Sequence, residues 1–285
     1  MLVMSTASVL IPADDTDHAA PAAAGPRYTL LLSTDAGDIE AAQRLRHHVF
    51  TSEPGFALTS TSPGFEAGLD ADRFDQFCDH LLVREDTSGE LVGCYRMLPP
   101  PGAIAAGSLY TATEFDVRAL DTLRPSLVEM GRAVVRGDHR NGAVVLLMWA
   151  GILAYLDRCG YDYVTGCVSV PTHPMYEIPG SQLRGVRDFV LRRHGAPAEY
   201  TVRPYRPVTI DGRTLDEIDP PARVSVPALM RGYLRLGAEV CGEPAHDPDF
   251  GVGDFPALLD KRKADVRYLK RLRSVAQAGE MAAGA

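Results

Sequence analysis

The segment 127–143 constrains the fold of this chain more than any other. It reads as an apolar strand that carries one acid, Glu129, and one arginine, Arg132, followed by a turn at residues 137–138 and the apolar stretch 143–158. A strand that enters a helix through a glycine-containing turn points backbone N–H groups of the helix start toward an anion. The sequence therefore predicts a sheet with an anion site at a helix N-terminus. Glu129 interrupts the apolar strand, so it is placed either toward solvent or for chemistry.

The remaining pattern alternates strands with helices. Strands are predicted at 27–33, 80–85, 90–98, 126–136, 161–170 and 199–206, and helices at 38–50, 143–158, within 173–194, at 226–241 and at 257–276. This order predicts an α/β fold, a mixed sheet with helices on both faces. Residues 1–26, rich in Ala, Pro and Asp, are expected to be a disordered tail. Residues 27–256 are expected to form the folded domain, and residues 257–285 a basic C-terminal helix and tail.

Composition excludes several classes of function. The net charge of −8 over 285 residues argues against a general nucleic-acid binder. The five cysteines form no CxxC pair and the histidines show no metal-ligand spacing, so we expect free thiols and no metal. No GxSxG, P-loop or zinc signature is present in the sequence. No apolar run reaches the ~20 residues that cross a bilayer, and the first residues lack a basic start, so a cytoplasmic location is expected.

Several short motifs carry a resemblance to a known family. Arg46-His47-His48-Val49-Phe50 resembles the RxxVF motif of acyl-homoserine-lactone synthases and their relatives. Asp75 and Asp79 match the paired acids that follow it, Arg96 matches the strand arginine, and Glu129 with Arg132 matches the paired Glu and Arg. The narrower resemblance, over about residues 27–255, is to the L-ornithine N-α-acyltransferases of the GNAT fold. It is carried by the segments 78–81, 110–116, 129–132, 139–142 and 232–238.

That resemblance implies a GNAT-like fold with a mixed, mostly antiparallel central sheet and helices on both faces. It implies an enzyme that moves a (3-hydroxy) fatty acyl group from acyl carrier protein to the α-amino group of ornithine or a similar amino acid. The product would be lyso-ornithine lipid, and no cofactor would be bound. The motif residues Arg46, Phe50, Asp75, Asp79 and Arg96 are expected to bind the amino-acid substrate, with arginine binding a carboxylate and aspartate an ammonium. The alternative is that the charged residues form a structural network that holds the helix and loop to the sheet. The resemblance assigns the donor's phosphopantetheine to Val134, Val135, Arg140, Asn141, Gly142 and Ala143.

The donor follows from a departure from the coenzyme A pattern. Coenzyme-A-dependent GNAT enzymes carry Q/R-x-x-G-x-G/A before the helix, whereas here the later positions, counted from Arg140, are Ala143 and Val145. A loop without these glycines cannot let its backbone approach a pyrophosphate closely. Acyl carrier protein presents only phosphopantetheine, so we expect it as the donor rather than acyl-coenzyme A. A second departure, at residues 170–174, leaves the identity of the amino acid open.

Amide formation from a thioester requires a base, because an amino acid's amine is mostly protonated at neutral pH, and it requires stabilisation of an oxyanion. Glu129 is the expected base, directly or through a water, since burial would raise its pKa; Arg132 is assigned to the catalytic site with it. The alternative is a buried structural ion pair of Glu129 with Arg132 or Arg96. The resemblance implies that N–H groups near Val134 and Val135 stabilise the oxyanion.

Two other functions fit the same residues. One is synthesis of another N-acyl amino acid or of a signal of the acyl-homoserine-lactone type, and the other is a non-catalytic module that binds acyl chains or carrier protein. The segment 261–273 is strongly basic with a narrow apolar stripe. We expect it to lie on anionic lipid at the inner face of the membrane, to dock an acidic carrier protein, or to pack on its own domain.

Overall fold

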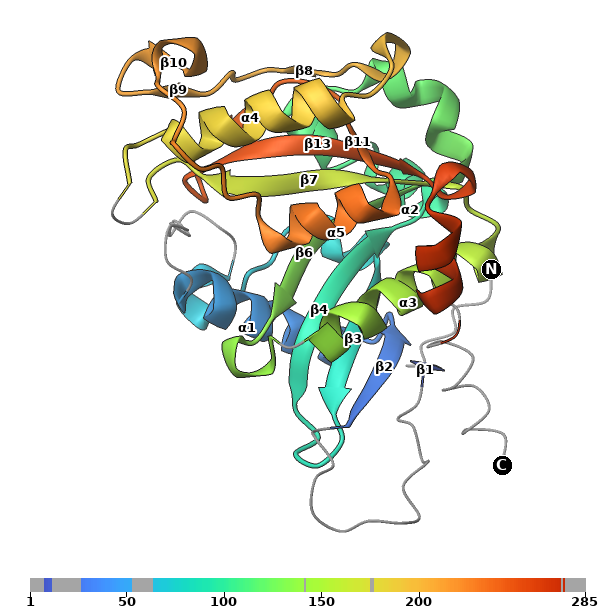
Figure 1. Cartoon of the computed structure of the whole chain (residues 1–285). Helices are drawn as coiled ribbons and strands as arrows, with labels where there is room; N and C mark the ends of the chain where they lie inside the picture. The colour runs from blue at the N-terminus through green and yellow to red at the C-terminus, as the bar shows by residue number, and fades with distance from the viewer. Residues whose placement is uncertain are drawn as a thin grey trace.

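The computed structural model of the protein describes residues 8–11, 27–52, 64–140, 142–174, 177–272 and 274. Its centre is a nine-stranded sheet in which β6 and β7 are parallel and the other neighbouring strands are antiparallel (Figure 1). Across the sheet the order is β1 (Ser8–Ile11), β2 (Tyr28–Ser33), β3 (Asp79–Glu85), β4 (Leu91–Leu98), β6 (Leu127–Val135), β7 (Tyr163–Pro171), β13 (Val252–Asp260) and β11 (Glu239–Val240), with β12 (Ala245–Asp247) beside β13. The predicted mixed, mostly antiparallel sheet is confirmed.

Helices cover both faces of the sheet, as predicted. They are α1 (Ala36–Ser52), α2 (Pro100–Ala106), α3 (Gly142–Cys159), α4 (Ser181–His194) and α5 (Ala228–Leu236). Successive residues of a strand point to opposite faces. Leu30 and Leu81 accordingly join the apolar core that α3, α4 and α5 share, whereas their neighbours Leu31 and Leu82 join the core under α1.

Shorter elements make up much of the connections between these strands and helices. The 3-10 turns are η1 (Phe65–Ala67), η2 (Asp75–Phe77), η3 (Thr111–Thr113), η4 (Arg118–Ser126), η5 (Gly137–His139), η6 (Ala198–Tyr200), η7 (Leu215–Glu217) and η8 (Lys261–Lys263). Two small ribbons pair β5 (Phe115–Asp116) with β8 (Arg203–Pro204) and β9 (Thr209–Ile210) with β10 (Arg213–Thr214). A separate apolar cluster holds α2, η4 and the β5–β8 ribbon to the sheet.

α3 is the central core helix. Its 18 residues are long and apolar enough to cross a membrane by length and composition alone. Residues along most of its length are buried, and it packs against β1, β2 and β3. Its apolar surface is therefore used inside the fold, as the sequence predicted for this segment.

Two predicted domain boundaries are wrong. Residues 8–11 of the expected tail form β1, in which Leu10 is buried against β2 because a short apolar segment gains by covering the sheet edge. The expected boundary after residue 256 falls inside β13, which pairs with β7 along its whole length. Pro256 lacks an N–H, so a run that contains it does not read as a central strand. Helical backbone begins only at residue 266.

Two other elements are shorter than predicted. The strand expected at 199–206 is reduced to β8, which lies outside the central sheet. The helix expected at 226–241 ends at Leu236, because Gly237 has a φ of 95° and turns the chain into β11. The apolar residues that follow are therefore part of the sheet rather than of the helix.

The sheet opens between β6 and β7. Their pairing covers only three residues, from Leu127 to Glu129. On its other side β6 carries a bulge, since Cys94 pairs with Val134 whereas Arg96 pairs with Gly131, which leaves one extra residue in β6. β6 therefore bends away from β7 just after Glu129, and a gap opens in the middle of the sheet.

Gly166 is required where β7 passes this bend. A Cβ added there would lie 2.2 Å from the carbonyl oxygen of Met130, which is backbone and cannot rotate away. We expect Gly166→Ala to destabilise the protein by about 1–3 kcal/mol in urea denaturation. Gly137→Ala is the control, because a Cβ there meets nothing within 4 Å. Equal stability of the two variants would contradict this account of the opening.

Candidate functional site

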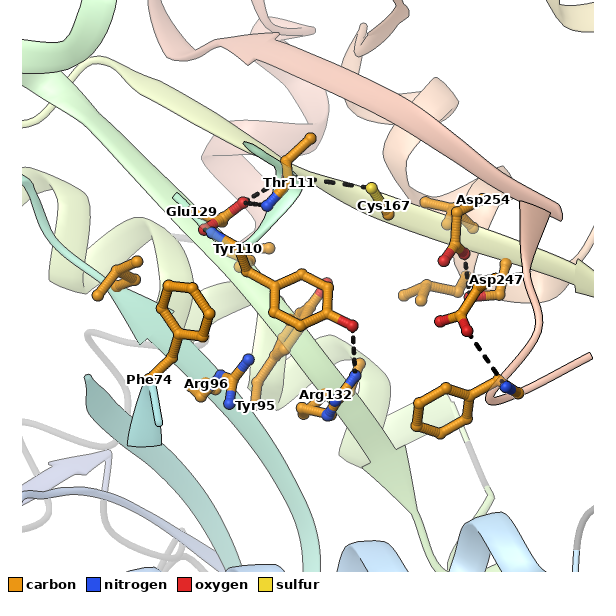
Figure 2. A pocket seen from close by; sticks show the side chains of 18 of the residues that line it. Phe74, Tyr95, Arg96, Tyr110, Thr111, Glu129, Arg132, Cys167, Asp247 and Asp254 are labelled. Atoms are coloured by element: carbon orange, nitrogen blue, oxygen red, sulfur yellow. Dashed lines mark hydrogen bonds between the residues drawn. The ribbon is translucent and has the colours of Figure 1, made fainter. Parts of the chain in front are cut away.

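The opening between β6 and β7 holds a cavity of about 360 Å³. Figure 2 shows Glu129 and Arg96 toward one side of it and Asp247 and Asp254 toward the other, with the ring of Tyr110 between them. The lining also includes Phe50, Phe74, Cys78, Tyr95, Thr111, Met130, Gly131, Arg132, Ala133, Cys167, Val168, Ser169, Leu229 and Phe250. The cavity is therefore apolar in most of its wall and charged at two opposite places.

Glu129 is 4% exposed and lines this cavity. Its Oε1 accepts hydrogen bonds from the N–H of Thr111, at 2.7 Å, and from the Thr111 hydroxyl; its Oε2 accepts one from the N–H of Tyr110. Among the described residues it has no ion pair, so the expected alternative of a pair with an arginine is not found. Burial raises the pKa of Glu129 above its ordinary value, and the hydrogen bonds from Thr111 and Tyr110 oppose that rise.

Arg132 lies in the bulge of β6 and has an unusual backbone conformation. Its φ is 55°, in the left-handed region, which costs a non-glycine residue about 1–3 kcal/mol. Its guanidinium lies 3.2 Å from Asp70 and 3.4 Å from Asp72 and from the Tyr110 hydroxyl, and its Nε has no hydrogen-bond partner. The rings of Tyr110 and Phe250 flank it at 5.0 and 4.9 Å. Such long contacts leave the guanidinium able to bind a carboxylate.

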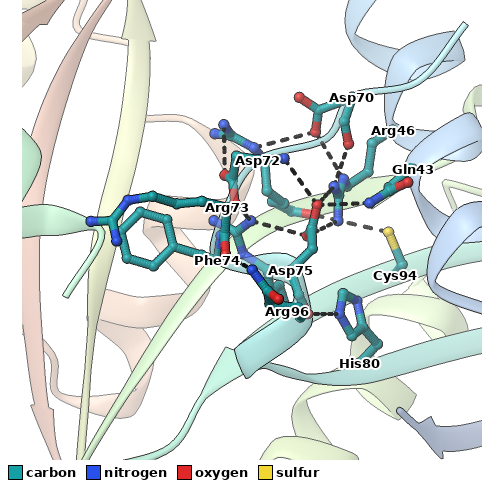
Figure 3. Close-up of polar contacts among 12 residues, drawn as sticks. Gln43, Arg46, Asp70, Asp72, Arg73, Phe74, Asp75, His80, Cys94 and Arg96 are labelled. Carbon is teal, nitrogen blue, oxygen red and sulfur yellow. Dashed lines mark hydrogen bonds and ion pairs between the residues drawn. The ribbon is translucent and has the colours of Figure 1, made fainter. Parts of the chain in front are cut away.

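Arg46 and Arg96 are held far more tightly (Figure 3). Arg46 is 1% exposed and donates to Asp70 at 2.8 Å and to both carboxylate oxygens of Asp75 at 3.0 and 2.9 Å. Arg96 donates to Asp72 at 2.7 Å and to Asp75 at 3.1 Å. Burial alone would raise the pKa of Asp75, but the guanidinium of Arg46 and then that of Arg96 outweigh it and hold the pKa well below its ordinary value.

These positions correct three of the expected substrate contacts. Arg46 and Asp75 lie behind the cavity wall, where their mutual pairing supports Arg96, and neither lines the cavity. Asp79 begins β3 on the opposite face and accepts a hydrogen bond from the Tyr155 hydroxyl of α3 at 2.6 Å. Strand alternation sends it away from the site. Of the five expected contacts, Phe50 and Arg96 line the cavity.

A second cavity, of about 380 Å³, lies on the α3 and α5 side of the sheet. Its wall includes three of the expected donor-binding residues, Val134, Val135 and Arg140. Gly142 and Ala143 are the first two residues of α3 and follow Arg140 closely in the chain. Asn141 lies outside the described residues. The two cavities share Phe50, Tyr95, Ala133 and Leu229, so they meet at the opening in the sheet.

Several residues of this site were not predicted from the sequence. Tyr110 and Thr111 belong to the segment 110–116 that carried the resemblance, which was a usable signal. Asp72 stands three residues before Asp75 and pairs with Arg96. Asp247 and Asp254 had no signal, because only the order of β12, β13 and β7 in the sheet brings them to the cavity.

A parallel strand pair that opens beside a buried carboxylate, where two cavities meet, is the arrangement of a GNAT-type N-acyltransferase, and residues 45–150 match the family model described as acetyltransferase (GNAT) domain. The L-ornithine N(alpha)-acyltransferase of Brucella abortus is 34% identical over 84% of this chain and 86% of its own. That of Rhodobacter capsulatus is 32% identical over 87% of this chain and 95% of its own. The chain belongs to the L-ornithine N(alpha)-acyltransferase family.

Solved structures give a more distant likeness. The acyl-homoserine lactone synthase LasI aligns with a TM-score of 0.47 at 12% identity, covering 88% of this chain and 96% of its own. The coenzyme-A-dependent synthase BjaI aligns with a TM-score of 0.45 at 17% identity, covering 85% of this chain and 83% of its own.

Asp75 and Asp79, four residues apart, offer a matched test of the support network. Asp75→Asn leaves Arg46 and Arg96 short of a buried anion, so we expect a loss of about 3–5 kcal/mol in urea denaturation at neutral pH. Asp79→Asn is expected to cost less than about 1 kcal/mol, because burial raises the pKa of Asp79 and its partner is a hydroxyl.

The pH dependence has a definite sign. The folded pKa of Asp75 lies below its ordinary value, so its contribution is present above about pH 4 and is lost as the pH falls further. The stability difference between wild type and Asp75→Asn should shrink in acid. Equal losses of unfolding free energy in the two variants at neutral pH would contradict the view that Asp75 supports the buried arginines.

Proposed function

We propose that the protein transfers a (3-hydroxy) fatty acyl group from acyl carrier protein to the α-amino group of L-ornithine, giving lyso-ornithine lipid. The observation that carries this proposal is the similarity to relatives named L-ornithine N(alpha)-acyltransferase. It extends over 84% of the chain and 86% of the relative at 34% identity. The two joined cavities support it, since an acyl donor and an amino-acid acceptor need separate entries that meet at one point.

In this reaction the amine nitrogen attacks the thioester carbonyl, its proton passes to a base, and the thiolate leaves and is protonated. Glu129 is the proposed base, with Arg132 beside it. An ionised carboxylate has about four acceptor positions. Tyr110 and Thr111 use three of them, which leaves one for the amine or for a bridging water. The raised pKa of Glu129 favours proton transfer.

The oxyanion is proposed to form against the backbone of β6 beyond the bulge. The N–H of Arg136 donates to Val92 on the β4 side. Because N–H directions alternate along an antiparallel pair, that of Val135 is expected to point away from β4, toward the gap left by β7. An N–H that has lost its strand partner is suited to an oxyanion.

The donor thiol is proposed to enter through the second cavity. Val134, Val135 and Arg140 line it, and the start of α3 follows. A phosphate at a helix start needs only a few N–H groups and one cation. Arg140 and Arg231 are exposed at this end, where Leu229 lines the cavity, and they offer positive charge to an acidic carrier protein.

We further propose a cytoplasmic location with peripheral contact at the inner face of the membrane. In the basic segment 261–273, Leu269 and Leu272 are buried in the protein's own core, whereas Val266 is exposed. Most of the contact would therefore come from charge, through the exposed Arg267, Lys270 and Arg271. Lys261 pairs with Asp157 near the end of α3, about 8 Å along that helix from Ile152, which lines the donor cavity.

The reaction is tested directly with purified components. Wild-type protein, 3-hydroxyacyl carrier protein and L-ornithine should give N-acylornithine by mass spectrometry, and acyl-coenzyme A at equal concentration should be a much poorer donor. The control omits ornithine. Failure to form N-acylornithine would overturn the proposed reaction, and equal use of acyl-coenzyme A would overturn the proposed donor.

Glu129→Gln tests the base. We expect kcat to fall by about 100-fold or more. In wild type the rate should fall as the pH drops through the raised pKa of Glu129, because the protonated carboxyl cannot accept the amine's proton; the variant should lack this limb.

Thr111→Val separates the base from the scaffold role of the same carboxylate, because it removes one hydrogen bond to Glu129 and leaves the carboxylate in place. Its acidic limb should persist. If Glu129→Gln kept the acidic limb of wild type, Glu129 would be a positioning residue only.

A further inference from the structure

Three carboxylates gather at the side of the cavity opposite Glu129. Glu114, Asp247 and Asp254 each place a carboxylate oxygen within 4.8 Å of the others. Asp247 is 8% and Asp254 5% exposed, and both line the cavity (Figure 2). They come from β12, β13 and the loop before β5, so the fold itself, rather than one local turn, brings them together.

These acids are held by hydrogen bonds rather than by ion pairs. Within the part of the chain that the structure describes, none of the three makes an ion pair. Asp247 accepts from the N–H groups of Asp249 and Phe250, and Asp254 accepts from Ser169 at 2.5 Å. The Oε2 atom of Glu114 is fully buried and has no hydrogen-bond partner. Buried carboxylates in this state must bind either protons or a cation.

The pKa values of two of these acids are raised, as expected for buried carboxylates without an ion-pair partner. Burial raises the pKa of Glu114, and the charges of Asp254 and Asp247 raise it further. Burial likewise raises the pKa of Asp254, opposed by its hydrogen bond with Ser169. A cationic group placed among them would be held by charge-assisted hydrogen bonds and would release the bound proton.

A residue of opposite charge lines the same cavity. Arg132, whose contacts with the chain are all 3.2 Å or longer, lies close enough for its charge to act on all three acids. The cavity thus offers a guanidinium and a group of carboxylates in a wall that is otherwise mostly apolar. A neutral amino acid would leave the carboxylates without a cationic partner, whereas an amino acid with a second amine would pair with both groups.

We propose that Glu114, Asp247 and Asp254 bind the side-chain ammonium of a diamino acid while Arg132 binds its carboxylate, so that this cluster selects the acceptor. The inference rests on the proposed function, since it names how that site recognises its amino acid. A divalent cation is the other occupant that three carboxylates could take. The cavity also holds the guanidinium of Arg132, which would repel a divalent ion and attract an amino acid's carboxylate.

The test compares two acceptors of equal carbon chain, L-ornithine and L-norvaline, which lacks only the side-chain amine. With wild-type enzyme and one acyl carrier protein donor, ornithine should be preferred in kcat/KM by about 100-fold or more, because norvaline leaves buried acids unpaired. Asp254→Asn should lose most of this preference through a higher KM for ornithine, with norvaline little changed. Asp121→Asn is the matched control, an exposed acid paired with Arg124 on η4.

Two controls separate recognition of the amine from loss of folding and from metal binding. Removing one of three clustered acids relieves repulsion, so Asp254→Asn and Glu114→Gln should melt no lower than wild type. Ornithine, but not norvaline, should raise the melting temperature of the wild-type protein without donor. Retained preference for ornithine in both folded variants would overturn the inference, as would loss of ornithine activity in EDTA that Mg²⁺ or Mn²⁺ restores.

The two proposals fail in different ways. If wild-type enzyme acylates no ornithine at all, the proposed function fails. If it acylates ornithine and prefers it to norvaline equally well without the Asp254 carboxylate, only the assignment of the cluster fails.

Discussion

The strand β6 pairs with its two neighbours, β4 and β7, over different lengths. It pairs with β4 along most of its length but with one extra residue at Arg132–Ala133, and it pairs with β7 over only three residues. A bulge on one side and an early end to pairing on the other force the strand to bend where the sheet would otherwise be closed. The two cavities meet at this bend, which is where the proposed reaction brings the thioester and the amine together. Gly166, which lets β7 pass the Met130 carbonyl, belongs to the same constraint.

The charges around the opening are compensated to different degrees. Arg46, Arg96 and their three aspartates pair at 2.7–3.1 Å, which fixes the cavity wall. Removing one partner from such a network is costly, although the network as a whole adds little net stability over apolar packing. Arg132 has contacts of 3.2 Å or longer, and among the described residues the three acids of the Glu114 cluster have no ion-pair partner. A rigid, fully paired wall behind two incompletely paired groups is what a site for a charged ligand requires, because the ligand supplies the missing partners.

Sequence reasoning recovered what local pattern encodes. The central strands, α1, α3 and α4 follow from periodicity. Glu129, Arg96 and Phe50, which line the cavity, could be named from the sequence because each stands in a recognisable motif. The edge strand β1 and the strand β13 were missed because a tail-like composition and Pro256 hide them. Asp79 was misassigned because spacing along the chain does not tell which face of a strand a side chain takes. Asp247 and Asp254 could not be predicted from the sequence, because it is the order of the strands in the sheet that brings them to the cavity.

The arrangement of these charges also bears on which amine reacts. A side-chain amine is more basic than an α-amino group. Held among three carboxylates, the side-chain amine stays protonated and cannot attack a thioester. The α-amine lies next to the carboxylate that Arg132 would hold, so it reaches the bend of β6 and the last acceptor position of Glu129, where it can lose its proton. The three carboxylates would then have two effects. They would select a diamino acid, and they would keep its side-chain amine protonated, so that this amine does not compete for the acyl group.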